Sequence, residues 1–169
     1  MGRLIKIVVA VALVFSASGC SGPFSFNGPM SSDAWSGEQC APASSLPATV
    51  GIASLTATRS TTITAVKLIG ASGITSTVSY LIPGDGPPLG VDADPPSEFS
   101  LNSIGPNRWK ARRNAVGADI SPGQPAPQLV LQITGAVGKA DSIEVEYSSG
   151  NSQYTLSIPR RLRVASPAC

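Results

Sequence analysis

The chain has 169 residues, of which 12 are Lys or Arg, 10 are Asp or Glu and none is His, and its formal net charge at pH 7 is +2. The lack of His excludes Ser-His-Asp and Cys-His catalysis and His-ligated zinc. It also removes the side chain best suited to proton transfer near neutral pH. A hydrolase that uses two carboxylates stays chemically possible.

The start of the chain predicts an export signal. Arg3 and Lys6 precede the apolar run 7–15, and small residues then lead into Cys20. The cations hold the start of the chain on the cytoplasmic side, the apolar run enters the export channel, and small residues before a cysteine allow a peptidase to cut. This order resembles the lipobox of bacterial lipoproteins, with Ala17 where that motif more often has Leu.

The lipobox resemblance implies that residues 1–19 are a signal peptide and that Cys20 becomes the lipidated first residue. A lipoprotein cysteine carries more than one acyl chain, as stable anchoring requires. One alternative is an uncleaved transmembrane helix, for which the apolar run is shorter than the ~20 residues required. The other is an ordinary secretory signal. We therefore expect a lipid-anchored protein on the extracytoplasmic face of the cell membrane.

Removal of the signal peptide changes the charge of the chain. Ten cations and ten acidic residues remain once Arg3 and Lys6 are removed, so the mature protein is nearly neutral. Such a chain has no overall field that would recruit nucleic acid or anionic lipid. The expected partners are the membrane, through the lipid, and a cell-envelope polymer or protein, with no nucleic acid.

Residues 20–39 are rich in Ser, Gly and Pro, with isolated aromatic residues at Phe24, Phe26 and Trp35. This composition does not form a core, so we expect a flexible tether. The three rings have two interpretations: they dock on the domain or in the headgroup region, or they have no specific role.

Two further cysteines bound the expected folded domain, residues 40–169. In an oxidising compartment, Cys40 and Cys169 most simply form a disulfide. Closure of so long a loop stabilises the fold by ~4 to 5 kcal/mol in the chain-entropy model, as an upper figure. A free thiol and an intermolecular bridge are the alternatives. About 130 residues suffice for one domain with a sizeable core.

From residue 46 onward the hydrophobic pattern has a period of two, and no stretch shows helical spacing. The pattern predicts strands at residues 50–59, 61–69, 74–82, 98–102, 108–116, 129–133, 143–147 and 154–158. Runs rich in Gly, Pro and Ser separate them, including residues 135–138. One face of strand 74–82 is expected to carry Ile74, Val78, Tyr80 and Ile82, with Leu81 as an exception.

Short strands with such breaks predict an all-β protein, an antiparallel immunoglobulin-like β-sandwich of about seven to eight strands. A barrel is the alternative fold. The pattern of the chain also resembles small secreted immunoglobulin-like proteins of actinobacteria. The resemblance rests on residues 66–73, 80–83, 112–113, 117–123 and 145–147, with Trp109, Tyr154 and the terminal cysteine. It implies the fold and an envelope setting, and it implies no reaction.

An acidic cluster lies in the loop 85–98 and contains Asp85, Asp92, Asp94 and Glu98. Its carboxylates could bind calcium, but the segment lacks the ligand spacing and the glycine of an EF-hand loop. They could also form a carboxylate-based active site. The structural interpretation is an exposed loop that prolines stiffen and acidic residues keep solvated.

A basic segment at residues 108–113 is the best local candidate for a contact surface. If the segment is extended, Arg108, Lys110 and Arg112 project from one face and Trp109 from the other. The three cations could bind phosphate or carboxylate groups of an envelope polymer. The alternative is an edge strand that charge protects from aggregation, with Trp109 in the core.

These patterns predict a non-catalytic interaction or structural module of the cell envelope, with no cofactor and no metal. The alternative from a different class is a carboxylate-dependent envelope enzyme that resembles glycan hydrolases, with the loop 85–98 over its site. Such an enzyme would have two carboxylates facing each other in a cleft. Periplasmic metal carriage is a weaker option, because the mature chain has no His and only Met30.

Overall fold

A computed structural model describes residues 28–34 and 36–169 of the chain. The predicted signal peptide (residues 1–19), the predicted lipid attachment site Cys20 and the aromatic residues Phe24, Phe26 and Trp35 lie outside the described residues. In the part that is described, no helix is long and apolar enough to span a membrane.

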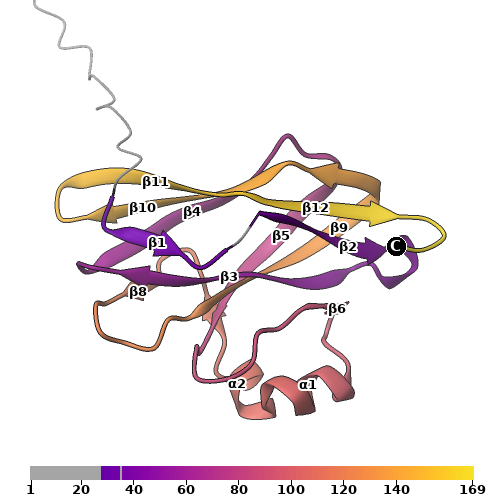
Figure 1. The fold of residues 1–169 in the computed structure, drawn as a ribbon, viewed down its shortest axis with the longest axis horizontal. Coiled ribbons are helices and arrows are strands. Elements are labelled where there is room, and N and C mark those ends of the chain that lie inside the picture. Colours follow the sequence, from indigo (N-terminus) through magenta and orange to yellow (C-terminus); the bar gives the residue numbers. More distant parts are fainter. Residues whose placement is uncertain (1–27, 35) are drawn as a thin grey trace, which may run out of the picture.

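The described residues form an all-β sandwich of two packed sheets, as the sequence predicts (Figure 1). The larger sheet contains β1 (Met30–Ser32), β2 (Gly37–Pro42), β3 (Ala48–Ala57), β5 (Ser72–Ile82), β6 (Val91–Ala93), β7 (Arg113–Asn114), β9 (Gln128–Ala140) and β12 (Arg160–Ala165). The smaller sheet contains β4 (Thr61–Ile69), β8 (Asp119–Ile120), β10 (Ser142–Ser149) and β11 (Ser152–Ile158). Four of these twelve strands have only two or three residues, and the other eight match the expected number.

Most strands pair antiparallel, and the exception joins the two ends of the domain. Strand β2 lies parallel to β12, with Cys40 opposite Arg163. The Sγ atoms of Cys40 and Cys169 are 2.07 Å apart and their Cα atoms 5.8 Å apart, which confirms the predicted disulfide. The bond ties β2 to the end of the chain that follows β12, where Figure 1 marks the C-terminus.

The folded region begins before Cys40, so the expectation of a flexible tether over residues 20–39 is wrong for its second half. Strand β1 pairs with the end of β3, and Met30 is buried in the core. The Met30 N–H donates to the Tyr147 hydroxyl (3.3 Å). Residues 37–39 belong to β2. The Ser- and Gly-rich composition conceals both strands, because backbone pairing to existing strand edges needs few apolar side chains.

Strand β9 is the long central strand of the larger sheet, and it pairs with β3, β5 and β12. The predicted break at residues 135–138 is wrong, because these residues lie within β9. The glycines there permit a close approach of β5. A Cβ atom at Gly135, whose φ is 125°, would lie 2.3 Å from the Gly73 carbonyl oxygen. The glycine therefore marks a contact between two backbones and not a turn.

Strand β5 changes face at a bulge at residues 76–78. Ile74, before the bulge, and Leu81, after it, both face the main core. Tyr80 and Ile82 lie on the opposite face of the sheet. The prediction that Ile74 shares a face with Tyr80 and Ile82 is therefore wrong, because one extra residue reverses the alternation. The bulge also explains why Leu81 is an exception in the sequence.

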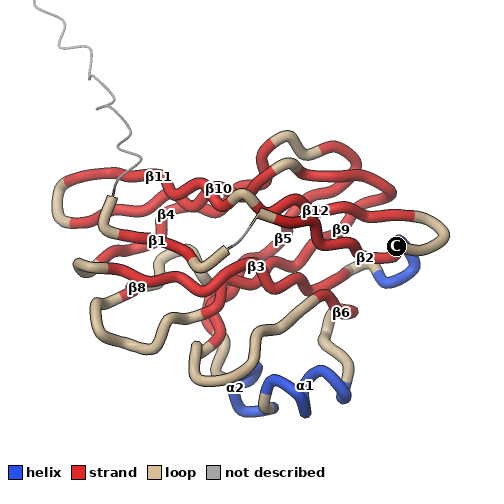
Figure 2. Tube along the Cα trace, in the orientation of Figure 1, coloured by secondary structure: helices blue, strands red, loops and turns tan. Residues whose placement is uncertain are grey.

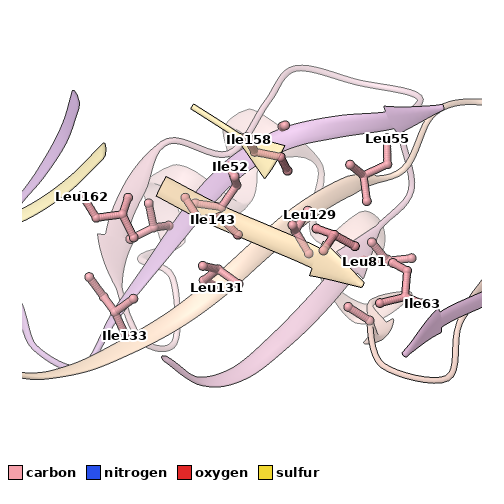
Figure 3. Close-up of a cluster of buried hydrophobic side chains, with 14 of the residues drawn as sticks. Ile52, Leu55, Ile63, Leu81, Leu129, Leu131, Ile133, Ile143, Ile158 and Leu162 are labelled. Carbon is pink, nitrogen blue, oxygen red and sulfur yellow. The ribbon is translucent and has the colours of Figure 1, made fainter. Parts of the chain in front are cut away.

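The main core fills the space between the two sheets (Figure 3). Each fully buried aliphatic side chain stabilises the fold by roughly 1.5 to 3 kcal/mol relative to an exposed one. The labelled members from the larger sheet are Ile52, Leu55, Leu81, Leu129, Leu131, Ile133 and Leu162, and those from the smaller sheet are Ile63, Ile143 and Ile158.

A second core lies on the outer face of the larger sheet, under two short helices (Figure 2). It consists of Ile82, Leu89, Ile104, Trp109 and Val130. The helices are α1 (Glu98–Ile104) and α2 (Pro106–Lys110), so the predicted strands at 98–102 and 108–116 are wrong apart from the short β7. A third, shorter helix at Ala43–Ser45 is of the 3-10 type.

Local signals explain the two helices. The Ser97 Oγ caps α1 by accepting from the Ser100 N–H (3.3 Å), and Pro106 occupies the start of α2, where a missing N–H costs nothing. Gly105, with φ of 91°, separates the two helices. Both helices are too short to form alone, so the burial of Ile104 and Trp109 in the second core stabilises them.

Candidate functional site

The acidic loop 85–98 uses its central carboxylate to hold its own shape. Asp92 accepts hydrogen bonds from the Ala93 N–H, the Ser97 N–H and the Ser97 hydroxyl, each 2.8 Å long. Partial burial raises the pKa of the Asp92 carboxyl. Hydrogen bonds from Ser100, Ser97 and the Ala93 amide outweigh this effect, so the pKa lies below its ordinary value of 3.8. Asp92 is therefore an ionised brace of the loop.

The other carboxylates of the loop contact different parts of the fold. Asp94 accepts from the Thr49 hydroxyl (3.1 Å) and from the Gln132 side-chain amide. Asp85 lies 3.4 Å from the Arg108 Nε, and Glu98 is exposed in the first turn of α1. Among the described residues, no three His, Cys, Asp or Glu side chains gather as a metal site would need.

Arg108 does not project from a strand face as the sequence predicts, because it lies in α2. Its guanidinium donates to three backbone carbonyls, those of Pro83 (2.8 Å from Nε), Pro87 (2.6 Å from Nη1) and Ile104 (3.1 Å from Nη1). Only 11% of its side chain is exposed. Arg108 thus fastens the proline-rich loop to the helices, and its donors are directed at this chain and not at an external anion.

Arg112 and Lys110 also fail to share a face with Arg108. The Arg112 guanidinium carbon lies 4.6 Å from the centre of the Trp109 ring and 5.4 Å from that of Tyr80, a cation–π arrangement that covers the second core. Lys110 is exposed at the end of α2. A role of Lys110 and Arg112 in anion binding stays a prediction. Trp109 is buried, as the alternative interpretation of this segment expects.

A hollow with no charged group in its lining lies between the two sheets, at the side where β4 faces β5. We call it the β4/β5 slot. It has a volume of about 420 Å³ and is lined by Val66 of β4, residues 76–79 of β5, Asn114 of β7 and Val116, which follows β7. Its lining side chains are valines, hydroxyls and one amide. The slot is therefore neutral and partly apolar.

Two other hollows are bordered in part by groups that already have partners. One of about 340 Å³ lies beside the proline-rich loops, where Asp85 contacts Arg108 and the Arg113 Nη2 donates to the Asp119 carbonyl (2.7 Å). The other, of about 250 Å³, lies against Gln128. The Gln128 amide both donates to and accepts from the Leu89 backbone. These hollows are shaped by contacts that hold loops in place.

Sequence patterns do not reveal the β4/β5 slot, because a slot of this kind arises where the edges of two packed sheets do not meet. The one available signal was the composition of β5. Its residues 75–79 are Thr, Ser, Thr, Val and Ser, without the Lys or Pro that commonly protects a strand edge.

No family model, no curated protein and no solved structure matches this chain. The resemblance to small secreted proteins of actinobacteria therefore stays an expectation from the sequence.

Proposed function

We propose that this protein is a lipid-anchored module on the extracytoplasmic face of the cell envelope, which binds another envelope component and catalyses no reaction. The observation that supports it most is the disulfide between Cys40 and Cys169. Disulfides persist in exported proteins and are rare in reducing compartments. The sequence has three cysteines, and the third is Cys20, at the end of the export-like segment.

The carboxylates support binding over catalysis. A carboxylate-dependent glycan hydrolase needs two carboxyl groups that face the scissile bond from a cleft. Asp92 and Asp94 instead accept hydrogen bonds from their own loop and from β3 and β9, and Asp85 contacts Arg108. Groups held in this way brace a fold. The alternative enzyme therefore receives less support than the binding module.

Cys20→Ser and Cys169→Ser form a matched pair that tests the anchor. We expect Cys20→Ser to lose metabolic labelling with palmitate and to leave the membrane fraction or remain an uncut precursor. Cys169→Ser should keep the label, because it removes the disulfide alone. Mass spectrometry that finds an unmodified mature terminus at another residue would reject the lipoprotein proposal.

A further inference from the structure

Both sheets have an open edge at the β4/β5 slot. Among the residues that the structure describes, β4 pairs with β8 only at Thr61 and Thr62, and β5 pairs with β7 only at Tyr80 and Leu81. The remaining residues of both strands have ladder partners on one side only. Such an edge presents backbone N–H and C=O groups that another extended chain can bond.

The chain itself shows what fits between the two edges. Residues 113–118 cross from one edge to the other at one end of the slot. The Ala115 N–H donates to the Ser79 carbonyl (2.9 Å), and the Gly117 N–H donates to the Ile63 carbonyl (2.8 Å). A stretch of backbone therefore bonds both edges there. The slot continues the space that residues 113–118 fill at one end. Among the described residues, none fills the rest of the slot.

The length of the open edge sets the size of the occupant. A short link joins Ile69, where β4 ends, to Ser72, where β5 begins. From this link the two strands continue in different sheets. The open part of β5 covers residues 72–78. At ~3.3 Å per residue these seven residues extend about 23 Å, which suits a strand of up to about seven residues.

The lining sets the chemistry of the occupant. Val66, Val78 and Val116 offer apolar contacts, and Val116 is 51% exposed. The nearest cation on β4, Lys67, is paired with Glu146 on β10. A charged occupant would lose hydration without meeting an opposite charge, which is unfavourable. An uncharged segment with β-branched side chains meets the valines on one face and keeps its backbone bonded.

We propose that the β4/β5 slot binds an extended, uncharged peptide segment of a partner polypeptide, which adds to the open edge of β5 as a short strand. This mode of recognition obtains affinity from main-chain hydrogen bonds and specificity from alternate side chains. The proposal rests on the binding role given above and not on the lipid anchor. A second folded copy fits less well, because it would have to reach the edge of β5 through a space that β4 and Val116 also border.

A synthetic peptide tests the proposal directly on the full chain in detergent micelles. The probe is an acetylated and amidated seven-residue peptide of alternating valine and threonine. We expect saturable shifts of backbone amide NMR signals at residues 72–79, Val66 and Val116. The same peptide with every internal amide N-methylated should not bind, because no backbone N–H remains along either edge of the strand.

Two exposed valines provide matched variants. Val116→Lys places a charge in the slot and should weaken binding of the probe about tenfold or more. Val137→Lys, at a valine that is 58% exposed on β9 and outside the slot, should leave binding unchanged. Both positions are at the surface, so neither variant is expected to unfold the domain.

Several results would overturn the proposal. They are the absence of shifts at millimolar peptide, shifts confined to other residues, equal binding of the N-methylated peptide, and an equal effect of the two Lys variants. A concentration-dependent dimer that occupies the edge of β5 would show that the slot joins two copies instead. Palmitate labelling of the same preparation separates a failure of the slot proposal from a failure of the lipid-anchor proposal. If a labelled chain does not bind the peptide, only the slot proposal is rejected.

Discussion

The layer formed by residues 83–112 and the neighbouring open edge of β5 differ in how their polar groups are bonded. In the layer, Arg108 donates to three carbonyls and Asp92 accepts from Ser97 and Ala93, so charged groups are bonded within the chain. Along β5, residues 72–78 carry no charge, and their backbone groups have no strand partner on one side among the residues that the structure describes. Arg108 and Asp92 therefore use their bonding capacity within the layer, whereas the edge of β5 keeps backbone groups that the described residues do not bond.

This contrast indicates which part of a small sandwich is available as a contact surface. Charged side chains on a loop often serve to fix that loop, since hydrogen bonds to ionised groups are stronger than neutral ones. An open strand edge retains bonding capacity that the fold does not use.

Trp109→Ala should have the largest effect, because it removes the largest side chain of the second core and the ring under Arg112. We expect the free energy of unfolding to fall by ~3 to 5 kcal/mol, as measured by denaturant titration. Phe99→Ala is the control. Its ring is 81% exposed on α1, so a change within about 0.5 kcal/mol is expected. Equal effects would show that the layer is not held by a core.

Arg108→Ala should destabilise by about 1 to 3 kcal/mol, because the carbonyls of Pro83, Pro87 and Ile104 lose their donor. Lys110→Ala, two residues away on the surface, should change stability by less than about 0.5 kcal/mol. Thermal unfolding of both variants provides the measurement. If Arg108→Ala is as stable as Lys110→Ala and loses affinity for cell-wall preparations, the arginine serves an external anion after all.

Asp92→Asn should have the smallest effect on stability, and one that depends on pH. Because the folded-state pKa of Asp92 lies below 3.8, ionisation of this carboxyl favours the fold above that value, and this contribution is lost as the pH falls through the folded-state pKa. The variant should therefore lose less stability than the wild type on acidification below about pH 4. Glu98→Gln, at an exposed carboxyl, is the control. Parallel stability curves for Asp92→Asn and wild type would contradict the bracing role.

The sequence correctly predicts the strands in which apolar and polar side chains alternate without interruption. Val145 and Tyr147 on β10 and Ile158 on β11 are buried as their period of two indicates. The face of β5 was predicted wrongly because a bulge reverses the alternation, and nothing in residues 76–78 announces the extra residue. Such features depend on the partner strand and not on the strand's own pattern.

The candidate sites were harder to predict than the fold. Cys40 and Cys169 were paired correctly because only one pairing remains once Cys20 is set apart. The sequence predicts a strand for the cations at 108–113, since their alternation with Trp109 has a period of two. In the structure, Pro106 and Gly105 set up a helix there, and burial of Trp109 stabilises it. An open edge such as that of β5 is a property of two sheets together, so no single stretch of sequence encodes it.

Site-specific photo-crosslinking in intact cells tests the central claim most directly. A benzophenone amino acid is placed at position 116 in the β4/β5 slot or at position 110 on the charged layer of the full chain. The account predicts an adduct with an envelope polypeptide from position 116, competed by the neutral valine–threonine peptide, and no such adduct from position 110. Adducts from position 110 alone, or adducts from position 116 that the peptide does not compete, would contradict it.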